Sequence, residues 1–127
     1  MSRELLDFLR ARLQDDEDYA RNAYADHNDA GPKWYEQWSG ALNIGEEEDL
    51  VLTNDSAISR HMERHDPARV LAEVEAKRAL LDDYERFVAE RRRMMGGWDS
   101  YPETSPVLTA FATVYADHPD YRSEWRS

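Results

Sequence analysis

The sequence has no cysteine among its 127 residues. Disulfide bonds, thiol catalysis and the cysteine-rich zinc motifs are therefore excluded. Glycine is also scarce, at five residues, and neither a phosphate-binding glycine loop nor the GxSxG turn of serine hydrolases occurs. Because the usual signatures of a reaction are missing, we expect a protein that is not an enzyme and needs no cofactor.

Basic residues are few relative to acidic ones. The chain has 16 Lys and Arg against 27 Asp and Glu, for a net charge of -11. Direct binding to nucleic acid or to an anionic membrane needs a basic face, so we expect a protein partner instead. No apolar run is long enough to span a bilayer. The apolar residues near the N-terminus are interrupted by Asp7, unlike a signal peptide, and we expect a cytoplasmic protein.

The pattern of apolar and turn-forming residues predicts an α+β fold. We expect one helix-dominated domain over residues 1–127, with a small antiparallel β-sheet and one long central helix. The first helix should occupy 1–25, and the sheet 33–53 with a turn at Ser39 and Gly40. A broken long helix should cover 55–95, and a helical tail 104–127.

The other predicted elements should pack around the long helix. Asp66 and Pro67 should break it and cap its main part, since proline fits the first helical turn and an Asp before it can accept from free N–H groups. Gly96 and Gly97 should end it. Its predicted apolar stripe consists of Val70, Val74, Leu81, Tyr84 and Val88, widened by Leu71, Leu80 and Phe87. About 28 helical residues would be about 42 Å long. The last turns should therefore project, bend or lie in a partner.

Histidines are the candidate metal ligands. His61 and His65 are four residues apart, which on a helix places both imidazoles on one face, as in two-histidine metal sites. His118 is a candidate third ligand. The residue after His61 is Met62, so the HExxH motif of metalloproteases is absent. If these histidines bind a metal, we expect zinc. The alternative is that they are structural or surface histidines without a metal.

Two stretches are candidate binding surfaces. Asp15, Asp16, Glu17 and Asp18 form an acidic run, which is either a solvated face or a contact for a basic partner. Trp34 and Trp38 would face one way on a strand. They either pack against a helix or form an exposed aromatic binding face.

Two motifs resemble a known protein family. Residues 61–78 read HMERHDPARVLAEVEAKR, and residues 115–126 read YADHPDYRSEWR. Both resemble a family of small actinobacterial and actinophage proteins described as a domain of unknown function. The resemblance implies that many members carry a cysteine-rich stretch just before the tail, which together with the paired histidines would suggest a metal site. This chain has Trp98, Tyr101 and Ser105 in that stretch, which implies that the fold does not need the metal.

Three functions remain open from the sequence. The favoured one is a non-enzymatic acidic binding or regulatory protein, with phage origin as one expectation. It would act by protein–protein contacts, either by covering a basic site or by helix pairing in a homodimer. The second is a metal-binding protein that uses His61 and His65. The third is a DNA mimic that inhibits a nucleic-acid-binding host protein, with acidic residues of the first helix and of 46–49 in one stripe.

Overall fold

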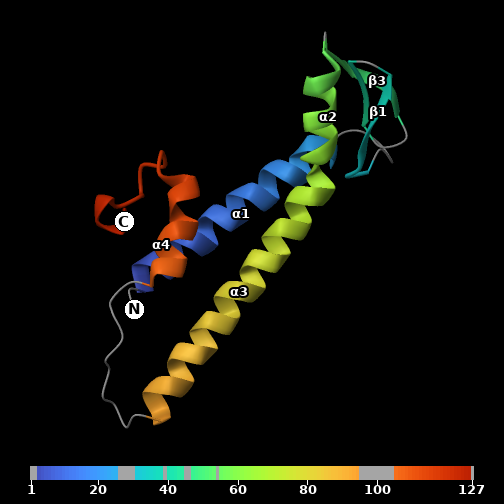
Figure 1. The fold of residues 1–127 in the computed structure, drawn as a ribbon. Helices are drawn as coiled ribbons and strands as arrows, with labels where there is room; N and C mark the ends of the chain where they lie inside the picture. Colours follow the sequence, from blue (N-terminus) through green and yellow to red (C-terminus); the bar gives the residue numbers. More distant parts are fainter. Residues whose placement is uncertain are drawn as a thin grey trace. The chain divides into compact units, whose positions relative to one another are not determined.

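The computed structural model describes residues 3–25, 31–38, 40–44, 47–53, 55–94 and 105–126. Its elements are labelled in Figure 1. In chain order they are α1 (Arg3–Ala25), β1 (Trp34–Trp38), β2 (Ala41–Ile44), β3 (Glu47–Leu52), α2 (Ser56–Arg64), α3 (Pro67–Met94), α4 (Pro106–Ala112), and the short 3-10 helices η1 (Thr113–Tyr115) and η2 (Ser123–Trp125). The predicted α+β class, dominated by helices with a small antiparallel sheet and one long helix, is confirmed.

The chain divides into two compact units. Unit 1 contains Met1–Leu13 and Lys77–Ser127, and unit 2 contains Gln14–Ala76. The helices α1 and α3 each contribute one segment to each unit. The expectation of a single domain over 1–127 stays a prediction. The predicted helix stop at Gly96 and Gly97 lies outside the described residues.

The sheet of unit 2 is antiparallel, with strand order β1-β2-β3. The turn between β1 and β2 depends on Gly40, whose φ of +88° is unfavourable for residues with a side chain. Its carbonyl accepts a hydrogen bond of 2.5 Å from the backbone N–H of Thr53. A Cβ at this position would collide with the carbonyl oxygen of Thr53. The close approach of the two backbones therefore requires glycine.

Helix α2 packs on β1 and β2 in the same unit (Figure 1). Its N-terminus is capped by Asp55, whose carboxylate accepts from the N–H of Ala57 at 2.8 Å. On the buried side, the hydroxyl of Ser59 donates to the carboxylate of Glu36 on β1 and to the carbonyl of Ser56. Residues of the helix and the sheet thus satisfy each other's polar groups where water is excluded.

The break between α2 and α3 is built on Asp66, which is buried. One carboxylate oxygen accepts from the N–H of Arg69 at 2.9 Å, and the other accepts from the N–H of Trp34 at 3.1 Å. The carbonyl of Pro32 accepts from the N–H of Ala68. The predicted cap of the long helix is confirmed, and the same residue also fixes the start of β1.

The core of unit 1 is formed by α1, the second segment of α3, and the tail. Its buried residues include Leu5, Leu6, Leu9, Leu81, Val88, Leu108 and Trp125. At the edge of this core, Arg10 donates to Asp82 at 2.9 Å and to Glu85 at 3.2 Å. Burial acts to lower the pKa of Arg10, but both carboxylates raise it by more, so the pKa lies above its ordinary value. Arg10 therefore stays charged, and its ion pairs with Asp82 and Glu85 link α1 to α3.

Candidate functional site

The motif at 115–126 forms an aromatic cluster around Phe8 of α1, within unit 1. The ring of Phe8 meets the rings of Trp125, His118, Tyr121 and Tyr115 at centroid distances of 5.0, 5.8, 6.1 and 6.3 Å. Most of these contacts are edge-to-face, the arrangement that aromatic quadrupoles favour. The motif thus fastens the tail to α1.

His118 has a defined hydrogen-bonding role in this cluster. Its Nδ1 lies 3.1 Å from Nη1 of Arg12 and 3.0 Å from the backbone N of Asp120. Both of these groups can only donate, so Nδ1 is the acceptor and the ring proton lies on Nε2. Through Nδ1, His118 therefore acts as an acceptor that orders the tail and holds Arg12 over the ring of Phe8, 5.1 Å from its centroid.

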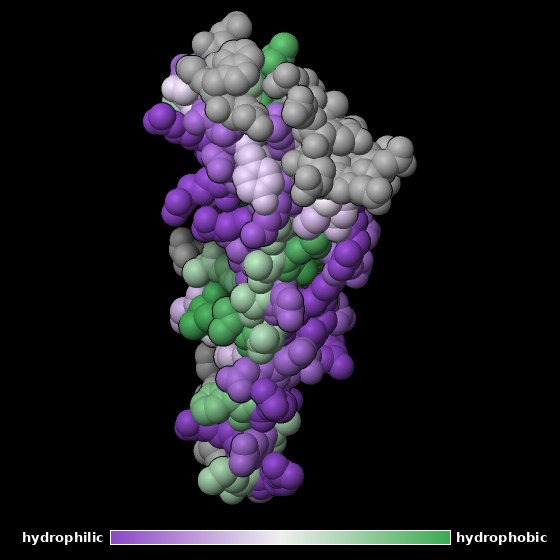
Figure 2. Space-filling view, turned by 90° about the vertical axis from the view of Figure 1, so that its right-hand side faces the viewer, coloured by the Kyte–Doolittle hydropathy of each residue, from purple (hydrophilic) through white to green (hydrophobic). Residues whose placement is uncertain are grey.

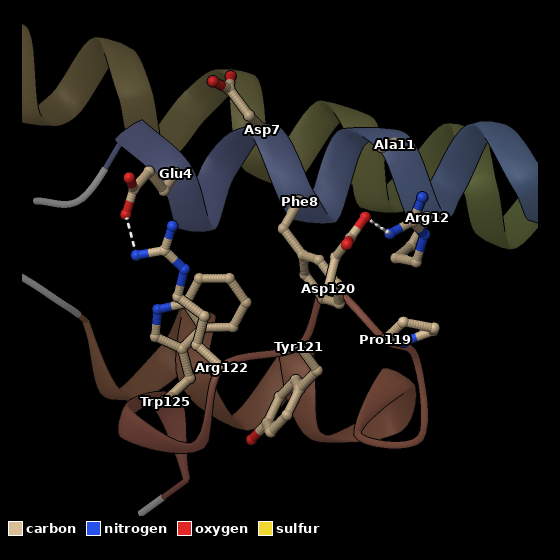
Figure 3. A pocket seen from close by; sticks show the side chains of 10 residues that line it. All are labelled: Glu4, Asp7, Phe8, Ala11, Arg12, Pro119, Asp120, Tyr121, Arg122 and Trp125. Atoms are coloured by element: carbon tan, nitrogen blue, oxygen red, sulfur yellow. Dashed lines mark ion pairs between the residues drawn. The ribbon is translucent and has the colours of Figure 1, made fainter.

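A pocket of about 550 Å³ lies beside this cluster (Figure 3). Its lining residues are Glu4, Asp7, Phe8, Ala11, Arg12, Pro119, Asp120, Tyr121, Arg122 and Trp125. Both guanidinium groups are already paired: Arg122 with Glu4 at 2.5 Å, and Arg12 with Asp120 at 4.0 Å. Figure 3 also shows the hydroxyl of Tyr121 pointing away from α1. An anionic ligand would have to displace these carboxylates from the two arginines. The pocket therefore offers no free cationic group for such a ligand among the residues that line it.

Two candidate metal ligands lie side by side at the C-terminal end of α2, His61 in its last turn and His65 as its C-cap. The ring centroids of His61 and His65 are 4.5 Å apart, and both residues are exposed. His118, the third candidate, belongs to unit 1, where its Nδ1 is engaged as described above. Within the described ranges, no group of three or more His, Cys, Asp or Glu residues could hold a metal ion. The structure therefore shows a histidine pair without a third ligand there.

The acidic run on α1 is partly engaged within its own helix. Asp15, Asp16 and Glu17 are half-buried, and Asp18 is exposed. The amide of Gln14 donates to Glu17 at 3.2 Å and to Asp18 at 2.9 Å. These carboxylates thus do not form a uniformly exposed acidic surface.

Of the two candidate aromatic residues on β1, only Trp34 has a side chain that the structure describes. Trp34 is half-buried, and its indole Nε1 is buried without a hydrogen-bond partner. Trp38 ends β1, and its side chain lies outside what the structure describes. The register shifts between Glu36 and Trp38, so simple alternation does not hold across this strand. Packing explains Trp34 better than ligand binding does.

The exposed apolar surface lies on the unit 1 segment of α3. Leu80, Phe87 and Met94 are 64%, 52% and 80% exposed. Seven residues separate each from the next, which is close to two helical turns, so they follow one side of α3. We call these three residues the exposed stripe. Leu81 and Val88 are buried one residue further along and form a separate face of the helix.

The exposed stripe includes an apolar hollow of about 440 Å³ lined by Phe87, Glu90, Arg91 and Met94. Their spacing is i, i+3, i+4 and i+7, which is the four-residue hole that accepts a side chain of a facing helix in coiled coils. In Figure 2, hydrophobic groups alternate with hydrophilic ones toward the lower end, where Figure 1 places the end of α3. Two apolar and two charged side chains thus line this hollow on the exposed side of α3.

The sequence pattern had assigned Leu80 and Phe87 to the core stripe, and the structure shows that this was wrong. The sequence nevertheless contains a pattern that indicates a second apolar face on α3. Val74, Leu81 and Val88 repeat every seven residues, and so do Leu80, Phe87 and Met94. Two such sets offset by one residue indicate a helix with two apolar faces.

Together, the fold and its surfaces define a small, helix-dominated α+β protein with an exposed helical stripe. Residues 2–127 match the family of unknown function DUF6221, so the chain belongs to this family. No curated protein and no solved structure matches the chain. No helix in the part of the chain that the structure describes is long and apolar enough to cross a membrane.

Proposed function

We propose that this protein is a non-enzymatic binding or regulatory protein that acts by protein–protein contact through the exposed stripe of α3. The observation that carries the proposal is the hollow between Phe87 and Met94, which has the spacing of a coiled-coil hole. The occupant would be an amphipathic helix that inserts one apolar side chain. A cytoplasmic location and a phage origin belong to this proposal as expectations.

The free energy gained by burying apolar side chains supports a stripe that a partner protein covers. Burying one large apolar side chain is worth about 1.5–3 kcal/mol, so three of them can drive a specific contact. Their polar neighbours matter as well. Asp83 and Arg86 pair at 3.3 Å beside the stripe, and both side chains are strongly exposed. Exposed charges next to an apolar seam commonly select the partner and its orientation.

A double substitution, Leu80→Glu with Phe87→Glu, tests this proposal. Tagged wild type and variant are used to capture proteins from extracts of the source cells, with quantification by mass spectrometry. We expect a partner that the wild type retains and the variant loses, because two carboxylates in the seam cannot be desolvated without cost. Val107→Glu on α4 is the matched control, since Val107 is 71% exposed. Equal capture by all three proteins would refute the proposal.

A metal site at the C-terminal end of α2 is the second candidate function. The observation that favours it is the pair of exposed imidazoles of His61 and His65, with centroids 4.5 Å apart. The test is a zinc titration by calorimetry on the wild type and on His61→Ala and His65→Ala. One zinc bound per chain and lost in both variants would support the site. Zinc binding that survives both substitutions would count against it.

DNA mimicry stays a hypothesis. It requires one stripe formed by the acidic run of α1 and the carboxylates of 46–49, and the side chains of 46–49 lie outside what the structure describes. The partial burial of Asp15, Asp16 and Glu17 does not favour it. A mimic would compete with duplex DNA for its target, and competition in a binding assay would reveal it.

A further inference from the structure

We infer that the histidine pair at the C-terminal end of α2 is half of a zinc site, and that a second copy of this chain supplies the other half with its own His61 and His65. The inference rests on the metal site named above as the second candidate function, and it adds the partner. Structural zinc is held by four protein ligands in a tetrahedron. Two imidazoles from each of two copies related by a two-fold axis supply that number. The ring centroids within one pair are 4.5 Å apart, close enough for both rings to bind one ion at the usual Zn–N distance of about 2.0–2.1 Å.

The carboxylates nearest to the pair in the sequence do not complete the site. Glu63 is two residues from each histidine, so it does not share their face of the helix. Asp66 is buried, and its two carboxylate oxygens accept from the backbone N–H groups of Arg69 and Trp34. Across the described residues, no group of three or more potential ligands could hold a metal ion. In that part of the chain, the pair therefore lacks the further protein ligands that structural zinc requires.

The face of α2 that carries the pair is accessible to another molecule. His61 and His65 are both exposed. Ile58 comes three residues before His61 and seven before His65, so it lies on the same face of the helix, and it is 51% exposed. Two copies that share a zinc ion through this face would bring Ile58 to the edge of the contact. Its burial would add a hydrophobic contribution to that of the metal.

Charge makes this pairing depend on the metal. Each copy has a net charge of -11, so two copies repel one another when no cation lies between them. Imidazoles bind a metal ion in their neutral form, so the ion brings its full positive charge into the contact. We therefore expect monomers without zinc and a dimer with one zinc ion for every two chains.

Sedimentation velocity in EDTA and in the presence of zinc tests the inference. Wild type is compared with His61→Ala and with His65→Ala, each of which leaves only two imidazoles in a pair of chains. We expect wild type to sediment as a monomer in EDTA and as a dimer after addition of half an equivalent of zinc, while both variants remain monomeric. Glu63→Gln is the matched control, because it changes a potential ligand on another face of the same helix and should dimerise as wild type does.

Cobalt(II) in place of zinc reports the number of ligands. Its visible absorption bands are intense in a tetrahedral site and weak in an octahedral, largely hydrated one. We expect intense bands that reach their maximum at half an equivalent of cobalt in wild type and in Glu63→Gln. Weak bands in wild type would contradict a site with four imidazoles.

The outcomes separate the inference from the proposals on which it rests. One zinc ion per chain on a protein that stays monomeric would overturn the second copy as partner and leave a metal site within one chain. No zinc binding would refute both the shared site and the metal-site candidate. A zinc-dependent dimer that persists in His61→Ala and His65→Ala would also overturn the inference, because the ligands would then lie elsewhere. Capture of a partner through the exposed stripe is tested separately by Leu80→Glu with Phe87→Glu.

Discussion

At the scale of residues, Asp66 joins two elements, because its carboxylate accepts a backbone hydrogen bond from each of them. One carboxylate caps α3 through the N–H of Arg69 and fixes β1 through the N–H of Trp34. The histidine–aspartate–proline sequence at 65–67, within one of the family motifs, is thereby explained as a break and a cap. The other motif is explained by the packing of its aromatic residues and His118 on Phe8. Neither motif needs a reaction to account for it.

Asp66→Ala should lower the free energy of unfolding by about 2–3 kcal/mol, because it removes a helix cap and leaves a partly buried N–H unpaired. Asp66→Asn should cost less, about 1–2 kcal/mol, because its amide oxygen can keep one of the two hydrogen bonds. Urea denaturation followed by circular dichroism measures both. Equal stability of Asp66→Ala and wild type would show that the double contact contributes nothing.

At the scale of elements, the sequence predicted where helices break and where the chain turns, but it did not predict which face of α3 is buried. Caps, prolines and turn glycines act within a few residues, so the breaks at Asp66 and Gly40 could be predicted from the sequence. Which arc of α3 is covered depends on α1 and the tail, which are distant in sequence. Helical periodicity placed Leu80 and Leu81 in one stripe, although only Leu81 is buried. The seven-residue spacing indicates two apolar faces on α3, but which face stays exposed depends on that packing and could not be predicted from periodicity alone.

Adjacent leucines on α3 provide a matched test of this division. Leu81 is 1% exposed and Leu80 is 64% exposed. Leu81→Ala should lower the free energy of unfolding by about 2–5 kcal/mol, because it leaves a cavity in the core. Leu80→Ala should change it by less than about 0.5 kcal/mol, as surface substitutions usually do. Equilibrium unfolding at a protein concentration low enough to keep the chain monomeric compares the two. Similar losses from both substitutions would contradict the assignment of two faces.

At the scale of the whole molecule, the open structural question is whether the two compact units unfold as one domain. Helices α1 and α3 each supply a segment to both units without a break. Because helix formation is cooperative along a continuous segment, unfolding of one unit should destabilise the helical segments of the other. The sequence-based expectation of one domain therefore has a physical basis in these two helices.

Native-state hydrogen exchange tests this cooperativity. Leu9 in unit 1 and Leu42 in unit 2 are fully buried and report the two cores. We expect their amides to exchange with opening free energies within about 1 kcal/mol of each other and with the same denaturant dependence, as for global unfolding. A lower free energy in one unit, with a weaker denaturant dependence, would show that the units open separately.

The central claim is that the protein works through the exposed stripe of α3, and photo-crosslinking in living source cells tests it most directly. A photoreactive phenylalanine analogue is placed at Leu80 and, in a separate protein, at Val107, which is also strongly exposed. The account predicts a discrete product heavier than the single chain from position 80 and little or none from position 107. Absence of any product at position 80, or equal products from both positions, would contradict it.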